Sequence, residues 1–267
     1  MKRIVFLAML FALVCNVSMA QDKPTKGSFS TEVNFKPFES NGNMFSLEDG
    51  YAFKVRYFLN EESALRFKLG FARDAKTNNV DLDLGGYSAD QEVSARWGDF
   101  SLSFGYERHF NMTKRINFYV GGELGFYRHF ASMEGEISLD GAKFDFEFSN
   151  MIPDENSLGG IINGLDHELQ YLAGMFKDPI EQLGAEPGQA YWGVAANAFA
   201  GLDFYVYKGF YIGSELGLNI KSHKTSDREI KYSATDLGSD KIKFNDNTRT
   251  TSIKFRIEPA IRLGLTF

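Results

Sequence analysis

The chain has little cysteine, little proline and no surplus of positive charge. Its 267 residues include one Cys, six Pro, and 29 Lys and Arg against 35 Asp and Glu. A single cysteine excludes a disulfide-stapled scaffold. The lack of a basic excess argues against nucleic acid as a partner. After the first 20 residues no run of 18 uncharged apolar residues occurs, so the sequence predicts no transmembrane helix.

The first twenty residues have the pattern of an export signal. Lys2 and Arg3 precede an apolar run over 4–14, and the small residues Ser18 and Ala20 follow it. Eleven apolar residues suit a signal peptide and are too few to span a bilayer. We therefore expect cleavage of residues 1–20. Cys15 allows a lipoprotein as an alternative, but a bulky Val14 stands where that cleavage site needs a small residue.

The remainder of the chain is rich in Phe, Tyr and Gly, and its apolar residues alternate with polar ones. This period of two is typical of β-strands. In the last segment Ile253, Phe255 and Ile257 share one face, while Lys254 and Arg256 share the other. We expect eight strands, close to residues 29–35, 51–59, 65–71, 100–106, 116–126, 192–204, 210–220 and 253–267. Pro259 cannot donate a backbone hydrogen bond, so we expect a bulge or weakened pairing there.

The connections alternate between short and long. Short turns are expected at 60–63, 111–115 and 208–209, and long loops at 39–50, 74–90, 131–189 and 222–249. In an up-and-down antiparallel barrel this order places all short turns at one end and all long loops at the other. The third loop is unusual. Its segment 141–149 alternates and suggests that the fifth and sixth strands extend as a hairpin, and its later apolar residues recur at helical spacing.

Alternation alone leaves open which face points inward. A soluble, lipocalin-like barrel has its apolar face inside, whereas a membrane barrel shows that face to lipid. Balanced charge on the polar face favours lipid outside, because opposite charges can pair inside a narrow barrel. Aromatic residues beside the short turns also favour it, since such rings suit a headgroup boundary. The expected interior charges are Glu32, Lys54, Arg56, Arg66, Lys68, Glu107, Glu123, Asp203, Glu215, Lys254, Arg256, Glu258 and Arg262; the aromatic residues are Tyr57, Phe58, Tyr106, Phe110, Phe118, Tyr119, Phe204, Tyr205, Tyr207, Phe210, Tyr211 and Phe267.

With this layout the chain resembles the small outer-membrane β-barrel family of Gram-negative bacteria, in an eight-stranded OmpA/OmpX-like form. The resemblance covers residues 27–267, and its most specific element is the ending Gly264-Leu265-Thr266-Phe267. It implies a cell outer membrane location, lipid as a partner, and a terminal Phe267 read by the barrel-assembly machinery. It also implies a short periplasmic tail over 21–26. We expect neither a plug nor a peptidoglycan-binding domain.

For function, the sequence favours an all-β barrel whose interior is closed by paired charges and whose long loops bind an unknown extracellular ligand. Eight strands enclose a space that side chains can fill. A narrow porin for ions or small solutes is the alternative. A lipid-modifying enzyme is a third possibility. The four histidines, however, are scattered, and none is followed two positions later by Ser, as the lipid A deacylase pattern would require; they are His109, His129, His167 and His223. We expect no enzyme activity, no cofactor and no metal site; Asp81 and Asp83 lack the remaining ligands of a calcium loop.

Overall fold

The computed structural model describes residues 23–35, 45–46, 53–83, 88–139, 142–154, 157–158, 170, 180, 182–185, 187–235, 238–257 and 261–267. The expected signal sequence lies outside these residues, as do Pro259 and most of the expected helix in 131–189. Among the described residues, no helix is long and apolar enough to cross a membrane.

Almost all of the described chain is antiparallel β-sheet. The strands are β1 (Phe29–Phe35), β2 (Phe45–Ser46), β3 (Phe53–Asn60), β4 (Ser63–Asp83), β5 (Ser88–Asn111), β6 (Ile116–Leu139), β7 (Ala142–Ser149), β8 (Met151–Ile152), β9 (Gly188–Gln189), β10 (Tyr191–Tyr207), β11 (Phe210–Thr225), β12 (Arg228–Ala234), β13 (Gly238–Phe244), β14 (Arg249–Ile257) and β15 (Ile261–Thr266). This confirms an all-β, antiparallel fold. The three short turns also lie where the sequence predicts them.

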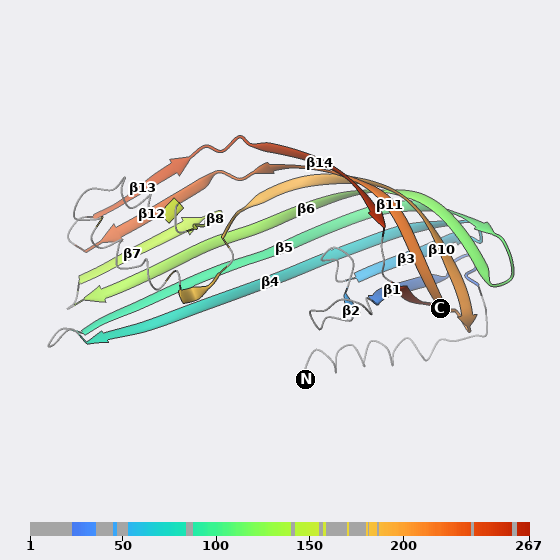
Figure 1. Cartoon of the computed structure of the whole chain (residues 1–267), viewed down its shortest axis with the longest axis horizontal. Helices are drawn as coiled ribbons and strands as arrows, with labels where there is room; N and C mark the ends of the chain where they lie inside the picture. The colour runs from blue at the N-terminus through green and yellow to red at the C-terminus, as the bar shows by residue number, and fades with distance from the viewer. Residues whose placement is uncertain are drawn as a thin grey trace.

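Eight of these strands pair in an order that returns to its starting point, and we call this set the strand circuit. β1 pairs with β3, and successive pairings run through β4, β5, β6, β10, β11 and β15, which pairs with β1 again. Phe29 and Phe267 exchange two backbone hydrogen bonds of 2.9 Å, joining the two ends of the described chain. In Figure 1 the circuit occupies the right-hand end of the molecule, together with the C-terminus.

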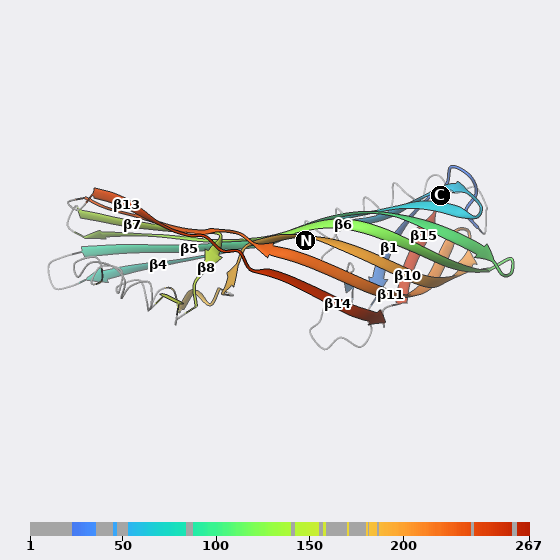
Figure 2. The same cartoon turned by 90° about the horizontal axis from the view of Figure 1, so that it is seen from above.

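The longest strands continue beyond the circuit, where they pair with further strands of the same sheet. We call this part the extension; it comprises residues 74–83 of β4, 88–97 of β5 and 131–139 of β6, together with β7, β12 and β13. Seen from above, the extension forms a thin layer at one end, while the circuit strands spread apart at the other (Figure 2). The predicted loops at 74–90 and 222–249 are therefore wrong in large part, because most of each is strand. Within 131–189 the segments 131–139 and 142–149 are strand. Only residues 84–87 separate β4 from β5.

The extension has a hydrophobic core on one face. Val93, Met133, Ile137 and the three phenylalanines of β7 are buried there, and Leu158, Ile180 and Leu183 from the segment between β8 and β9 pack on them. The hairpin predicted at 141–149 forms between β6 and β7. β10, the sixth predicted strand, is not part of that hairpin.

The two strands of the final segment, β14 and β15, pair with β11 in different registers. β14 pairs with β11 up to the Leu216–Ile257 pair, and β15 resumes at Gly213–Arg262. The bulge or weakened pairing expected at Pro259 lies outside the described residues.

Candidate functional site

Among the residues that the structure describes, ten charged side chains are buried inside the strand circuit, and we call them the charged core. Five are acidic and five are basic, so their formal charges cancel. They come from eight different strands, each of which directs alternate residues to the same side. The members are Glu32, Lys54, Arg56, Arg66, Lys68, Glu107, Glu123, Asp203, Glu215 and Arg262.

Arg66 lies at the centre of several of these ion pairs. Its guanidinium donates two hydrogen bonds of 2.9 Å to the carboxylate of Glu215 and one of 3.0 Å to Glu107. Its Nε lies 3.2 Å from Oε2 of Glu123. No pairing joins β4 to β11, so the Arg66–Glu215 contact spans the inside of the circuit. A planar guanidinium suits this geometry because its donors fit a carboxylate in a bidentate manner.

Arg56 and Arg262 bridge the remaining acids. Arg56 Nη1 donates to Asp203 at 2.9 Å and to Glu107 at 3.2 Å, and Arg56 also contacts Glu32. Arg262 Nη1 donates to Glu32 at 3.0 Å and to Glu215 at 3.3 Å. Each of these acids therefore contacts at least two basic side chains. Such cross-links offset the desolvation of a buried charge, which is otherwise costly.

The two lysines of the charged core contact acids at its margin. Lys54 Nζ lies 2.7 Å from Oε2 of Glu32, and Lys68 Nζ lies 2.9 Å from Oε1 of Glu123. Asn197 donates a further hydrogen bond of 2.6 Å to Glu123.

Three tyrosines and a histidine complete this interior. Tyr211 donates to Glu32 at 2.8 Å and accepts from Arg56 at 2.7 Å, and Tyr119 donates to Glu215 at 2.8 Å. His109 Nε2 lies 3.0 Å from Glu107. The sequence pattern predicts Tyr119, Tyr205 and Tyr211 in an outward aromatic girdle, but all three are buried, as is Phe58. The sequence does contain a signal for their burial: each of these four aromatic residues lies an even number of positions from a buried charge on the same strand.

Three of the thirteen charges expected inside, Lys254, Arg256 and Glu258, are not among the buried charges of the described residues. Lys254 is exposed and does not belong to the charged core; its strand β14 pairs with β11 alone among the described residues, which leaves the side chain uncovered. Arg256 lies in β14 opposite Gly217, and its side chain is outside the described part. Glu258 is outside it entirely. Phe267 follows β15 and is partly exposed.

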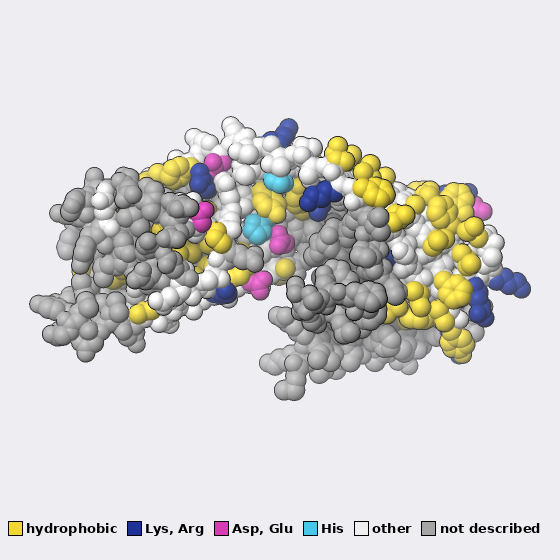
Figure 3. Space-filling view, viewed as in Figure 1, with side chains coloured by type: hydrophobic (Ala, Val, Ile, Leu, Met, Phe, Trp, Pro, Cys, Tyr) yellow, Lys and Arg dark blue, Asp and Glu magenta, His cyan; other side chains and the backbone are white. Residues whose placement is uncertain are grey.

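Large apolar side chains cover the outside of the circuit. Leu124 is 71% exposed, Phe104 60% and Phe71 61%, values typical of polar surface residues in a soluble protein. In Figure 3 the hydrophobic side chains gather over the end of the molecule formed by the circuit. The circuit therefore buries its charges and exposes its apolar groups.

The polarity reverses along single strands. In β6 the outward positions carry no charge up to Phe126 and then include Arg128 and Glu134, while the inward positions change from Glu123 to the buried Ala131 and Met133. In β5 the change falls near Asp99, which pairs with His129 of β6. The reversal thus lies at the same height on neighbouring strands. Beyond it, the extension has the apolar interior of a water-soluble sheet.

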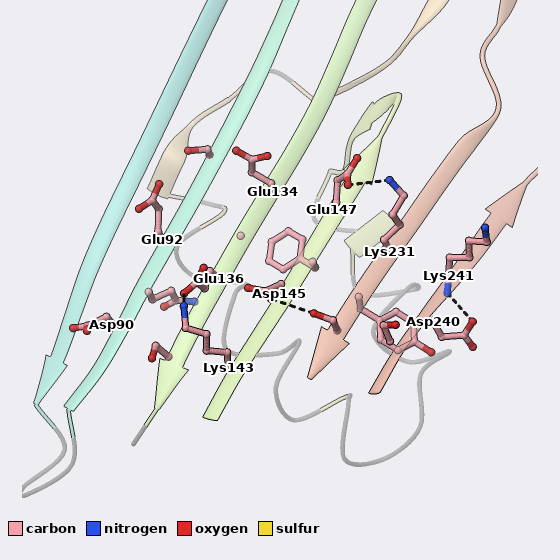
Figure 4. Close-up of a pocket in the computed structure, with 18 of the residues that line it drawn as sticks. Asp90, Glu92, Glu134, Glu136, Lys143, Asp145, Glu147, Lys231, Asp240 and Lys241 are labelled. Carbon is pink, nitrogen blue, oxygen red and sulfur yellow. Dashed lines mark hydrogen bonds and ion pairs between the residues drawn. The ribbon is translucent and has the colours of Figure 1, made fainter. Parts of the chain in front are cut away.

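The other face of the extension carries a polar hollow of about 1120 Å³. Figure 4 shows carboxylates of β5, β6 and β7 lying side by side, with lysines of β7, β12 and β13 around them. Glu92 is directly opposite Glu136, and Glu136 is opposite Asp145. Like charges at such positions repel. Lys143 contacts Glu136 at 2.5 Å, and the hydroxyl of Ser233 donates to Asp145 at 3.1 Å.

One ion pair at this hollow shifts the pKa values of both partners. The hydroxyl of Ser149 and the ammonium of Lys231, whose Nζ lies 3.0 Å from Oε2 of Glu147, lower the pKa of Glu147. Glu147 in turn raises the pKa of Lys231. Among the residues that the structure describes, no three His, Cys, Asp or Glu side chains are grouped to hold a metal ion.

Comparison with known proteins gives little similarity. No protein-family model matches the chain, and no curated protein matches it. The outer membrane protein OprG from Pseudomonas aeruginosa aligns with 92% of this chain and 99% of its own, at 9% identity and a TM-score of 0.32. CdiB from Escherichia coli aligns with 91% of this chain and 63% of its own, at 9% identity and a TM-score of 0.16. Because both scores are low, the function has to be argued from the chain's own residues.

Proposed function

We propose that the protein is an integral outer-membrane β-barrel of eight strands with a closed, charge-paired interior, and that its extension is an extracellular binding structure. Export through a cleaved signal at residues 1–20 and assembly through a signal at Phe267 belong to the same proposal. We propose no catalytic activity for it.

The observation that carries the proposal is the reversed polarity of the circuit. Its inside holds ten charged groups and its outside holds exposed Phe, Leu and Ile side chains. In water this arrangement would be unfavourable on both counts, because burying charges and exposing apolar area each cost free energy. In a bilayer the outward apolar groups contact lipid. Closed strand pairing also satisfies the backbone, as the membrane requires.

Strand length supports an extracellular position for the extension. A tilted strand needs about 9–11 residues to cross a bilayer. β5 and β6 each have 24 residues, about 80 Å at ~3.3 Å per residue. The residues beyond the length needed to cross a bilayer lie at the end opposite the short turns. At that end the apolar residues are on the inner face. The polar hollow there is the surface to which we assign the binding role.

The interior contacts support a closed barrel over the alternative of a narrow porin. Arg56, Arg66 and Arg262 each bridge acids from different strands, so the charged core links the walls of the circuit. In a conducting pore these groups would face a water-filled channel instead of contacting one another. The two functions are therefore separable by measurement.

The test is single-channel recording from the mature protein refolded into a planar bilayer, with a heat-shift gel to show that the barrel has formed. A closed interior predicts no discrete conductance steps from folded protein. Reproducible steps would favour the porin. In cells, mass spectrometry of the purified protein should find Gln21 at the N-terminus. Added protease should cleave the extension from outside and leave the circuit intact, and full cleavage of the circuit would contradict the membrane placement.

A further inference from the structure

Basic side chains and a tryptophan lie in one row across four neighbouring strands, and we call this the basic row. Arg128 of β6 pairs with Trp192 of β10, Trp192 pairs with Lys224 of β11, and Lys224 pairs with Arg249 of β14. Because paired residues point to the same side of a sheet, all four side chains share the outer face. They stand directly beyond the apolar outer residues, at the height where the polarity of the strands reverses.

The basic residues of this row lack ion-pair partners in the part of the chain that the structure describes. No described carboxylate lies within 4.0 Å of Arg128, Lys224 or Arg249. The Arg128 guanidinium instead lies 4.8 Å from the ring centre of Phe130. Arg96 of β5 differs from these three residues, because it has an ion-pair partner: it contacts Glu134 at 2.5 Å. The basic row therefore presents positive charge that no described acidic group neutralises.

An apolar groove of about 400 Å³ lies on the same outer face, next to the row. The groove is lined by Leu102 and Phe104 of β5, Leu124 and Phe126 of β6, Val194 of β10 and Ile220 of β11. Ala196 of β10 pairs with both Leu124 and Ile220, so its small side chain leaves the space between them open. Phe126 and Val194 are paired, two positions before Arg128 and two positions after Trp192, so one end of the groove adjoins the basic row.

We propose that the groove and the basic row together bind one phosphorylated lipid of the outer leaflet. An acyl chain would occupy the groove, and the phosphate headgroup would contact Arg128, Lys224 and Arg249. Charge complementarity selects an anionic headgroup, and the apolar lining selects a hydrocarbon chain. Trp192 suits the boundary between them, because an indole has an apolar body and one N–H donor. The inference rests on the proposed membrane location of the circuit.

The test is native mass spectrometry of the folded, detergent-purified mature protein titrated with bisphosphorylated lipid A. The variant Arg128→Gln, Lys224→Gln, Arg249→Gln should bind this lipid roughly a hundredfold more weakly, given the usual contribution of a basic residue at an anionic membrane surface. Ala196→Phe, which fills the groove with an apolar ring, should weaken binding with the basic row intact. A matched control changes three basic residues at the short turns: Lys114→Gln, Arg115→Gln, Lys208→Gln. It should bind as the unmodified protein does.

The outcomes separate the possible ligands. Equal binding by the basic-row variant and the control would overturn the proposal. Displacement of the lipid by millimolar inorganic phosphate would show that the row binds free phosphate and would overturn the lipid assignment. Lipid A lacking one phosphate should bind more weakly than the bisphosphorylated form, and equal binding would refute recognition of the headgroup.

Failure of the proposed function gives a different result. If the protein does not insert into bilayers, it will show no heat-shifted form in any lipid, and the membrane proposal fails together with this one. If it inserts and folds but does not distinguish lipid A from uncharged lipid, only the inference about the basic row fails.

Discussion

At the scale of single residues, the stability of the circuit depends on buried charges that have several partners each. Removing one member of a buried ion pair leaves the other charged and desolvated, which is much more destabilising than losing an exposed pair. Glu215 shows the dependence: it contacts Arg66, Arg262 and Lys54. A change at one arginine therefore affects acids on several strands.

Replacing Arg66 by Met should lower the free energy of unfolding by about 3–5 kcal/mol, because Glu107, Glu123 and Glu215 each lose a charged partner. Urea unfolding in detergent micelles, followed by the heat-shift gel, measures this change. The matched control is Arg108→Met. Arg108 contacts Glu62 at 2.6 Å on the surface, so its loss should change stability by less than about 1 kcal/mol. Equal effects of the two changes would show a solvated interior and favour the porin.

A glycine of the last strand makes room for one of the interior tyrosines. A Cβ atom at Gly264 would overlap the ring of Tyr211. Gly264→Ala should therefore destabilise the barrel by about 1–3 kcal/mol, since overpacking forces the ring away from its partners Glu32 and Arg56. In a double-mutant cycle the same change should be less harmful when Tyr211 is already Ala. Additive effects would contradict a direct clash.

At the scale of elements, alternation predicts the circuit strands because each has one apolar and one polar face throughout. It fails in the extension for two physical reasons. In β6 the apolar residues change face after Phe130, so a pattern read in fixed phase ends there. In β4, residues 74–77 are exposed whatever their parity, so burial imposes no alternation on an edge strand.

The pairing of β7 with β12 should weaken in acid. The folded state has a lowered pKa for Glu147 and a raised pKa for Lys231. Stabilisation from a lowered carboxyl pKa is present above the unfolded value and is lost as the pH falls. That from a raised lysine pKa is lost at high pH. The pair therefore supports the extension between about pH 4 and pH 10.

Thermal unfolding of the extension, followed by Trp97 fluorescence in a Trp192→Phe background, should show a lower midpoint at pH 3 than at pH 7. Trp97 reports on this part because it packs on the apolar core of the extension. In Glu147→Gln the difference between the two pH values should shrink. An unchanged difference would assign the acid sensitivity to other groups.

At the scale of the whole molecule, the proposed function gives one chain two solvents: lipid around the circuit and water around the extension. The same β5 and β6 strands present apolar residues outward in the circuit and inward in the extension. Parity and charge balance locate ten of the thirteen expected interior residues. Parity and charge balance do not predict which of these residues form ion pairs with each other. Contacts across a circuit depend on strand tilt and stagger, and alternation does not encode either. Lys254 illustrates the limit: it has the correct parity, but no described strand covers it.

The two tryptophans of the chain test this two-solvent arrangement directly. Trp192 is outward and about half exposed beside the apolar belt, whereas Trp97 is on the inward face and packs on the core of the extension. In vesicles containing lipids brominated on the acyl chain near the headgroup, fluorescence of Trp192 in a Trp97→Phe variant should be strongly quenched. Trp97 in a Trp192→Phe variant should retain most of its emission. A water-soluble barrel would leave both unquenched. Equal quenching of both would place the extension in the bilayer, which its exposed carboxylates at Glu92 and Glu134 make energetically unfavourable.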